Sequence, residues 1–282
     1  MTRKNFASAA MSLALLTLSS GALANARVTV GHFAPFAPEL AGTSVSIRVN
    51  GQIALQNVLF GQFTEYLTLG PAGSYTVDVL PTGTNTVAIT ATLDLANNTD
   101  YTVLAVGDGN NQALSLLPLL DDNSAPAAGQ VKVRVVHAAP FANSLAATEV
   151  SVRDNSNNVV GGLTRVPFKG ASGYLSLPTA TYDLKVSTPD GNTTLIDPKP
   201  AALLAGGIVT LVATGGANGY ATGVTAIAAG AAPNNALPTF AIGPVKVRVA
   251  HFAPFAANLP GTAVRVRVNG SEILNNFQFR QF

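Results

Sequence analysis

The three histidines of the chain are the residues best suited to chemistry, since imidazole can act as a base, bind a metal ion or respond to pH. His32, His137 and His251 each begin a short motif in which Ala-Pro-Phe follows after one residue. Each motif has one histidine, whereas a metal site needs three or four converging ligands. Three interpretations stay open: a histidine bonded to the backbone of its own loop, a binding surface, or a metal ligand where motifs meet.

The phenylalanine that ends each motif is a second candidate. Exposed phenylalanines could form aromatic patches that hold a sugar, a peptide or a surface. Buried ones would instead plug the end of a hydrophobic core and need no ligand, which the rarity of large exposed apolar patches on monomers favours. The candidate binding residues are therefore His32, Phe36, His137, Phe141, His251 and Phe255.

Other catalytic and cofactor motifs are weak or absent in the sequence. The chain has no cysteine, which excludes disulfides, thiolate zinc sites and cysteine nucleophiles. Residues 108–110 and 190–192 read Asp-Gly-Asn but lack the series of carboxylates that calcium needs. Residues 170–173 are not a nucleophile elbow, because Tyr174 occupies its last place. We therefore expect no catalytic residue, no cofactor, no metal and no enzymatic activity.

The residues around the histidines belong to a repeat. Residues 28–63 align without a gap with residues 247–282, and 21 of 36 positions are identical. A more diverged copy begins at Val131, and in it Phe168 follows His137 at the same spacing as Phe63 follows His32. We therefore expect Phe168 to have the place of Phe63. Such internal repeats indicate tandem structural units.

The repeats divide the chain into two complete units and the beginning of a third. The third unit could pack against the second, recruit strands from another chain, or reflect a reading frame that ends early. We expect a signal peptide at 1–24, repeats at 25–120 and 131–229, a partial repeat at 245–282, and linkers at 121–130 and 230–244.

Hydrophobic residues recur at every second position within each repeat. In residues 131–135 three valines alternate with Lys132 and Arg134, and residues 264–268 show the same pattern. This alternation predicts strands with one apolar face and one cationic, solvated face. Asn50-Gly51 and Asn269-Gly270 follow such runs and predict two-residue hairpin turns. About six to eight short strands per repeat are typical of an antiparallel β-sandwich.

The apolar stretch 201–213 could be mistaken for a membrane-spanning helix. The chain carries no charge between Lys199 and Lys246. The equivalent part of the first repeat, however, contains Asp94 and Asp100. We therefore predict two buried strands here and no transmembrane span in the mature chain.

Residues 1–24 have the three parts of a secretory signal peptide. Arg3 and Lys4 form the basic start, residues 6–18 the apolar stretch, and Ala22-Leu23-Ala24 the small-residue end. The apolar stretch is shorter than the ~20 residues of a membrane span. We expect cleavage near Ala24 rather than anchoring, and export to the periplasm, the cell surface or the medium.

The charge of the chain changes along its length. The excess of 16 Lys+Arg over 14 Asp+Glu lies in the leader, so the pI of about 9.0 gives no reason to expect a nucleic-acid partner. The first repeat has two basic and six acidic residues, the second seven and five, and the third five and one. This gradient could drive head-to-tail self-association, or it could be ordinary variation among solvated faces.

The repeated pattern resembles the DUF4397 family of bacterial exported proteins. The likeness is carried by a strand ending in histidine, the Ala-Pro that follows, a valine-rich strand ending in Asn-Gly, and the later runs Tyr66-Leu-Thr-Leu and Tyr75-Thr-Val. The family motif usually continues Ser-Pro-Asp, so any role of that aspartate is absent here. The resemblance implies an extracytoplasmic immunoglobulin-like β-sandwich, and it implies no reaction.

The sequence thus predicts an all-β chain of tandem immunoglobulin-like antiparallel β-sandwich modules. We expect a non-enzymatic exported protein that serves as a structural or binding module of the cell envelope or surface, with an envelope or extracellular partner of unknown identity. The alternatives are a periplasmic protein that binds a metal or small ligand through its histidine loops, and an unrecognised hydrolase.

Overall fold

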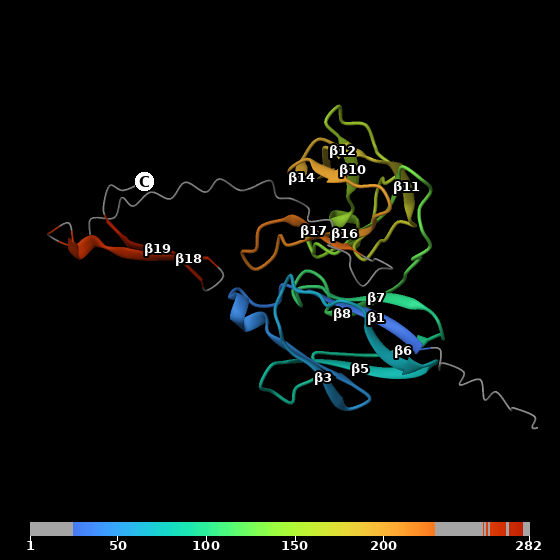
Figure 1. Ribbon diagram of the computed structural model, residues 1–282, viewed down its shortest axis with the longest axis horizontal. Coiled ribbons are helices and arrows are strands. Elements are labelled where there is room, and N and C mark those ends of the chain that lie inside the picture. Colours follow the sequence, from blue (N-terminus) through green and yellow to red (C-terminus); the bar gives the residue numbers. More distant parts are fainter. Residues whose placement is uncertain (1–24, 229–255, 257, 259, 269–270, 279–282) are drawn as a thin grey trace, which may run out of the picture. The chain divides into compact units, whose positions relative to one another are not determined.

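A computed structural model describes residues 25–228 and, in the third repeat, residues 256, 258, 260–268 and 271–278. The described residues fall into two units, one holding residues 25–228 and the other the described part of the third repeat. Apart from three short helical turns, the regular elements of the described residues are all strands (Figure 1), which confirms the predicted all-β fold of β-sandwich modules.

The first sandwich, residues 25–120, has two four-stranded sheets. Their strand orders are β4-β1-β7-β8 and β3-β2-β5-β6. All neighbours are antiparallel except β1 and β7, which are parallel and lie far apart in the sequence. The strands are β1 (Asn25–Phe33), β2 (Val45–Val49), β3 (Gln52–Val58), β4 (Leu67–Pro71), β5 (Gly73–Pro81), β6 (Ile89–Leu95), β7 (Asp100–Val106) and β8 (Ser115–Leu120).

The second sandwich, residues 130–228, repeats this plan with shorter strands. One sheet has the order β11-β9-β16-β17, again with one parallel pair, β9 and β16. The other layer has the sheet β10-β13-β14 and the pair β12-β15. The strands are β9 (Gln130–His137), β10 (Ser151–Asp154), β11 (Leu175–Pro178), β12 (Ala180–Tyr182), β13 (Leu184–Ser187), β14 (Thr194–Ile196), β15 (Ala201–Leu203), β16 (Ile208–Thr214) and β17 (Gly223–Ala228).

Two local predictions are confirmed. Asn50 and Gly51 form a two-residue turn between β2 and β3, with φ of 49° and 80°, as the Asn-Gly signal requires. The apolar stretch 201–213 contains the two predicted strands, of which β16 is buried and β15 only partly so. Among the described residues, no helix has the length and apolar character needed to cross a membrane.

The register predicted for Phe168 is wrong. The amide of His32 bonds to the carbonyl of Gln62, whereas that of His137 bonds to the carbonyl of Gly170. Gly170, and not Phe168, therefore lies beside its histidine as Gln62 does, so the second repeat contains a short insertion in this segment. Phe168 corresponds to Phe60 rather than to Phe63, and equal spacing in the sequence concealed the insertion.

A single helical turn recurs at the same place in each repeat. It comprises η1 (Leu40–Thr43) in the first sandwich and α1 (Leu145–Thr148) in the second. In the unit formed by residues 239–282, the same turn is η2 (Pro260–Thr262), and it leads into an antiparallel hairpin of β18 (Val264–Val268) and β19 (Ser271–Phe277). Asn269-Gly270, predicted as the hairpin turn, lies outside the described residues.

The two sandwiches of the first unit pack face to face. Alternate residues of β7 point to opposite sides: Val103 enters the core of the first sandwich, while Leu104 enters a cluster shared with the second. Val136 and Val212 of the second sandwich lie in that shared cluster. Sheet β4-β1-β7-β8 therefore lies against sheet β11-β9-β16-β17, and each fully buried Leu or Val contributes about 2 kcal/mol.

Candidate functional site

His32 and His137 are buried and bonded to the backbone of their own loops. Each side chain is 1% exposed. Nε2 of His32 donates to the carbonyl of Thr43 at 2.8 Å, and Nε2 of His137 donates to that of Thr148 at 2.6 Å. Burial lowers the pKa of both imidazoles. Both histidines are therefore neutral near pH 7 and hold their loops in place.

The bonded carbonyls belong to the recurrent helical turns. Thr43 and Thr148 are themselves buried, and their hydroxyls donate to the carbonyls of Leu40 and Leu145 at 2.6 and 2.8 Å. Each turn is thus fixed from inside by a histidine and a threonine. Its first residue faces outward: Leu40 is 48% and Leu145 is 59% exposed.

The phenylalanines of the motifs are partly buried against the histidines. The ring of Phe36 stacks on His32 at 5.8 Å, and that of Phe141 lies 5.6 Å from His137. Phe36 packs on the core of the first sandwich and Phe141 on that of the second. Both rings close the end of a sandwich. The remaining candidates, His251 and Phe255, lie outside the described residues.

The histidine loops of the two sandwiches meet loops of the neighbouring sandwich. The side-chain amide of Asn218 donates to the carbonyl of Pro35 at 2.5 Å, and that of Asn111 donates to Pro140 at 3.1 Å. These contacts are reciprocal, because Pro35 and Pro140 are equivalent residues of the repeat. The sandwiches therefore pair in the manner of an isologous dimer.

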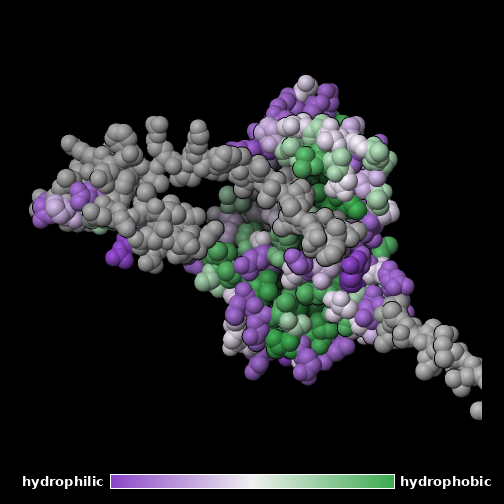
Figure 2. All heavy atoms as spheres, in the orientation of Figure 1, coloured by the Kyte–Doolittle hydropathy of each residue, from purple (hydrophilic) through white to green (hydrophobic). Residues whose placement is uncertain are grey.

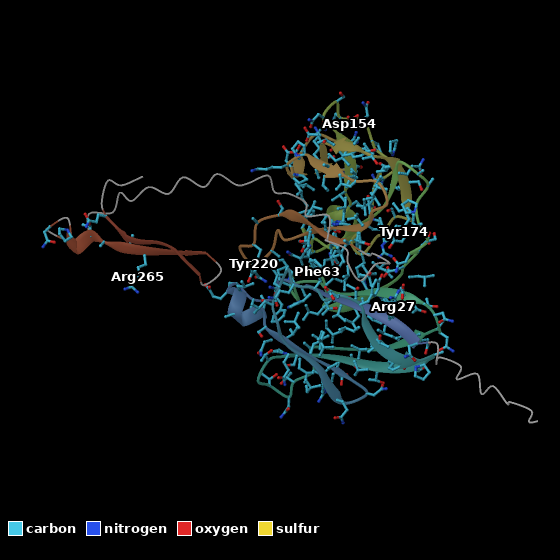
Figure 3. All side chains as sticks on the ribbon, in the orientation of Figure 1. Arg27, Phe63, Asp154, Tyr174, Tyr220 and Arg265 are labelled. Atoms are coloured by element: carbon cyan, nitrogen blue, oxygen red, sulfur yellow. The ribbon has the colours of Figure 1, made fainter. Side chains whose placement is uncertain are left out.

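All four of these loops lie at one end of the paired sandwiches. Each histidine loop follows β1 or β9, and its neighbour follows the parallel strand β7 or β16. At this end Tyr220, which is labelled in Figure 3, packs on Phe60, with ring centroids 4.6 Å apart. We call residues 34–43, 107–113, 139–148 and 215–220 the loop end.

A buried ion pair joins the sandwiches away from the loop end. Arg134 Nη2 donates to Asp121 Oδ1 at 2.6 Å, and the two side chains are 4% and 0% exposed. Arg134 also donates to the hydroxyl of Thr210, while the hydroxyl of Thr102 donates to Asp121. The charged atoms therefore have partners on both sides of the interface, as a buried pair requires.

Tyrosines and further charges surround this pair. Lys132 Nζ lies 2.6 Å from Asp122, and Lys132 and Arg134 both lie over the ring of Tyr174, at 5.3 and 4.8 Å. Tyr66 donates to Asp121 at 2.6 Å, and its burial raises its pKa far above the usual range. Tyr174, and with it this group of charges, lies away from the loop end that contains Tyr220 (Figure 3).

The cationic face predicted for residues 131–135 is not solvated. The strand itself is present as β9, but Lys132 and Arg134 are 5% and 3% exposed. The ring of Tyr174 lies against both side chains, and Asp122 and Asp121 of the connecting segment neutralise them. Arg134 also donates to the carbonyl of Leu120 in the first sandwich. The alternation predicted a strand correctly but could not show what covers its polar face.

The sequence of the chain matches a known protein family. The family described as Domain of unknown function (DUF4397) matches residues 26–148 and 141–260. The chain belongs to the DUF4397 family. This confirms the resemblance of the tandem repeats to DUF4397, and no curated protein matches the chain.

Two solved structures share similarity with this DUF4397 chain. One is CBMbc, a family CBM26 module of Eubacterium rectale Amy13K in complex with maltoheptaose, at 13% identity over 74% of this chain and 98% of that one, with a TM-score of 0.20. The other is a candidate adhesin of Bacteroides ovatus, at 9% identity over 73% and 96%, with a TM-score of 0.19. The family assignment rests on the sequence match.

Sequence reasoning missed two features of the DUF4397 fold in this chain. A leucine stands at the position of Leu40 and Leu145 in every repeat, since Leu259 has that place in the third. The adjacent acidic residues Asp121 and Asp122, followed by Lys132 and Arg134, are also visible in the sequence as opposite charges. Either signal could have been found by comparing equivalent positions.

Among the described residues, no group of three His, Cys, Asp or Glu side chains could hold a metal ion.

Proposed function

We propose that this DUF4397 protein is an exported, non-enzymatic binding module of the cell envelope or surface, and that it binds its partner through the loop end. The observation that carries this proposal is the outward placement of equivalent leucines, Leu40 and Leu145, on turns that buried histidines hold rigid. Apolar side chains held in one orientation lose little entropy when a partner covers them.

The pairing of the sandwiches supports the same proposal. Reciprocal contacts at Pro35 and Pro140 fix the two histidine loops relative to each other. Both leucines therefore belong to one rigid end, where two equivalent anchors can contact a single partner and strengthen binding together. The signal peptide expected at residues 1–24 supports export, and the partner would then be an envelope or extracellular component.

A binding experiment with matched variants tests this role. Labelled mature protein would be incubated with intact cells and with isolated envelopes of the producing organism, and the bound fraction measured. Leu40→Asp with Leu145→Asp should lower binding at least about tenfold, because two charges would enter the contact. Leu204→Asp is the control: Leu204 is 55% exposed but lies in the turn between β15 and β16, outside the loop end.

Three kinds of result would contradict the proposal. Equal binding by the loop-end variant and the Leu204 variant would place the contact elsewhere. Turnover of a glycan, ester or peptide by the purified protein, lost on replacing His32 and His137 by alanine, would make it a hydrolase. A stoichiometric zinc or copper ion in metal analysis, lost in the same variant, would favour the metal-binding alternative.

A further inference from the structure

The first sandwich contains an apolar cavity between its two sheets. The cavity has a volume of about 40 Å³. It is lined by valine, leucine, isoleucine and alanine side chains, so a water molecule inside would find no side-chain partner. Apolar cavities of this kind stay dry, and they bind hydrocarbons when access allows. The lining residues that are exposed or half-buried are Val30, Val49, Ala54, Leu55, Leu67, Leu69 and Leu116.

The cavity opens at one edge of the sandwich. The edge strands β6 and β8 contact each other and close the opposite side, but no comparable contact is found between β3 and β4 in the described structure. Most residues of β3 are exposed. Of the two that line the cavity, Ala54 is exposed and Leu55 is half-buried. Figure 2 shows hydrophobic side chains at the surface of the first sandwich, the lower one in that view. The core is thus reached from solvent between β3 and β4.

The size and lining of this opening define what it can hold. A dry cavity of about 150 Å³ takes up benzene, so this smaller one admits the end of a chain rather than a ring. Beyond the cavity, Leu55, Leu67 and Leu69 continue the aliphatic surface to the edge of the sheets. A linear hydrocarbon fits this shape, with its terminal methylenes inside and the rest between β3 and β4.

We propose that the first sandwich binds a linear alkyl chain, as found in a fatty acid or a lipid, in the cleft between β3 and β4. This site is independent of the loop end and does not rest on the function proposed above. Recognition comes from burying methylenes, and the head group stays in water.

The second sandwich has a carboxylate at the position of Val49. Asp154 ends β10 where Val49 ends β2, as their pairing with Leu184 and Val77 shows. A carboxylate at this place cannot line a hydrocarbon site without losing its hydration. The second sandwich folds with Asp154 at this position. We therefore expect the first sandwich to fold with the substitution Val49→Asp.

Calorimetric titration of the mature protein with dodecanoate and with dodecanol tests the proposal. Both should bind with similar affinity, because they share the chain and differ in the head group. Acetate should not bind. Val49→Asp should weaken dodecanoate binding at least about tenfold. Ile53→Asp should leave it unchanged, since Ile53 is exposed on β3 and pairs with Arg48 away from the cavity.

Methyl NMR keeps the test decisive even where Val49→Asp fails to fold. Dodecanoate should shift the methyl signals of Leu55, Leu67 and Leu69 and leave those of Leu175 and Leu177 in the second sandwich unchanged. A parallel arm with phosphatidylcholine vesicles shows whether the chain is also taken from a bilayer; binding in either arm supports the site. Absence of binding in both, or shifts scattered over both sandwiches, would overturn it.

Discussion

Arg134 and Asp121 form an ion pair that is enclosed between the two sandwiches, with 2.6 Å between Nη2 and Oδ1. Asp121 directly follows the last strand of the first sandwich, and Arg134 lies on the first strand of the second. The pair therefore ties the start of the connecting segment to the second sandwich, at the interface between the two sandwiches. This charge interaction acts beside the shared hydrophobic cluster in fixing the relative placement of the two sandwiches.

Removing one partner of this pair should destabilise the protein strongly. Asp121→Asn leaves Arg134 buried without a counter-charge, and such losses cost about 3–5 kcal/mol. Replacing both, as Asp121→Leu with Arg134→Met, should restore most of the stability, because no charge is then buried. Urea unfolding followed by tyrosine fluorescence measures the difference in the free energy of unfolding.

The exposed ion pair between Arg165 and Glu149 provides the control for this experiment. Arg165 is largely exposed, so Arg165→Met should cost at most about 1 kcal/mol. Equal costs for Asp121→Asn and Arg165→Met would mean that water reaches the interface.

The shared hydrophobic cluster predicts that the two sandwiches unfold together. Leu104 is fully buried, and it belongs to the cluster that both sandwiches share rather than to the separate core of either one. Leu104→Ala should lower the free energy of unfolding by about 2–5 kcal/mol and shift both sandwiches in one transition. Differential scanning calorimetry checks this, since a calorimetric enthalpy equal to the van't Hoff enthalpy indicates a single unit. Two separate transitions, with one unaffected, would contradict it.

The strands could be predicted from sequence because their signals are local. Asn50-Gly51 specifies its turn through two φ angles, and the valines near Val131 specify a strand through their period of two. The parallel pairing of β1 with β7 joins residues at the two ends of the sandwich sequence, for instance Val28 with Tyr101, and no local pattern encodes it. The burial of Arg134 likewise depends on the other sandwich.

The candidate site illustrates the same limit. The motif around His32 identifies a residue capable of chemistry, but its bonding partner is the carbonyl of Thr43, a backbone atom that carries no sequence signal. The side chain of Leu40 is exposed only because the turn is fixed from inside. Sequence could therefore locate the loop but could not decide which of its residues faces solvent.

Gly107 and Gly215 should be required at the loop end. They are equivalent, both have positive φ, and a Cβ on either would collide with a backbone carbonyl, that of Ala113 or Ala221. Gly107→Ala should therefore destabilise the protein by more than about 1 kcal/mol. Gly51→Ala is the matched control, because Gly51 also has positive φ but no atom lies within 4 Å of its Cβ position. Thermal unfolding of the two variants compares them, and a smaller effect at Gly107 would show that the loop can relax.

The buried histidines predict a loss of stability in mild acid. Burial lowers the pKa of His32 and His137 in the folded state, while the unfolded chain keeps a value near 6.5. Below about pH 6.5 the unfolded state binds more protons, so the free energy of unfolding should fall until the pH passes the folded-state pKa. The slope is at most about 1.4 kcal/mol per pH unit for each histidine.

Urea unfolding at a series of pH values, with matched variants, checks this assignment. His32→Gln with His137→Gln replaces the imidazoles by amides that can still donate to Thr43 and Thr148, and it should remove most of the slope between about pH 6.5 and pH 5. Asp122→Asn should leave that window unchanged: Lys132 lowers the pKa of Asp122 to about 2, so its contribution is present above the ordinary value of 3.8 and is lost only in stronger acid. A slope that persists in the histidine double variant would assign the acid sensitivity to other groups, and the imidazoles would then hold their turns without sensing pH.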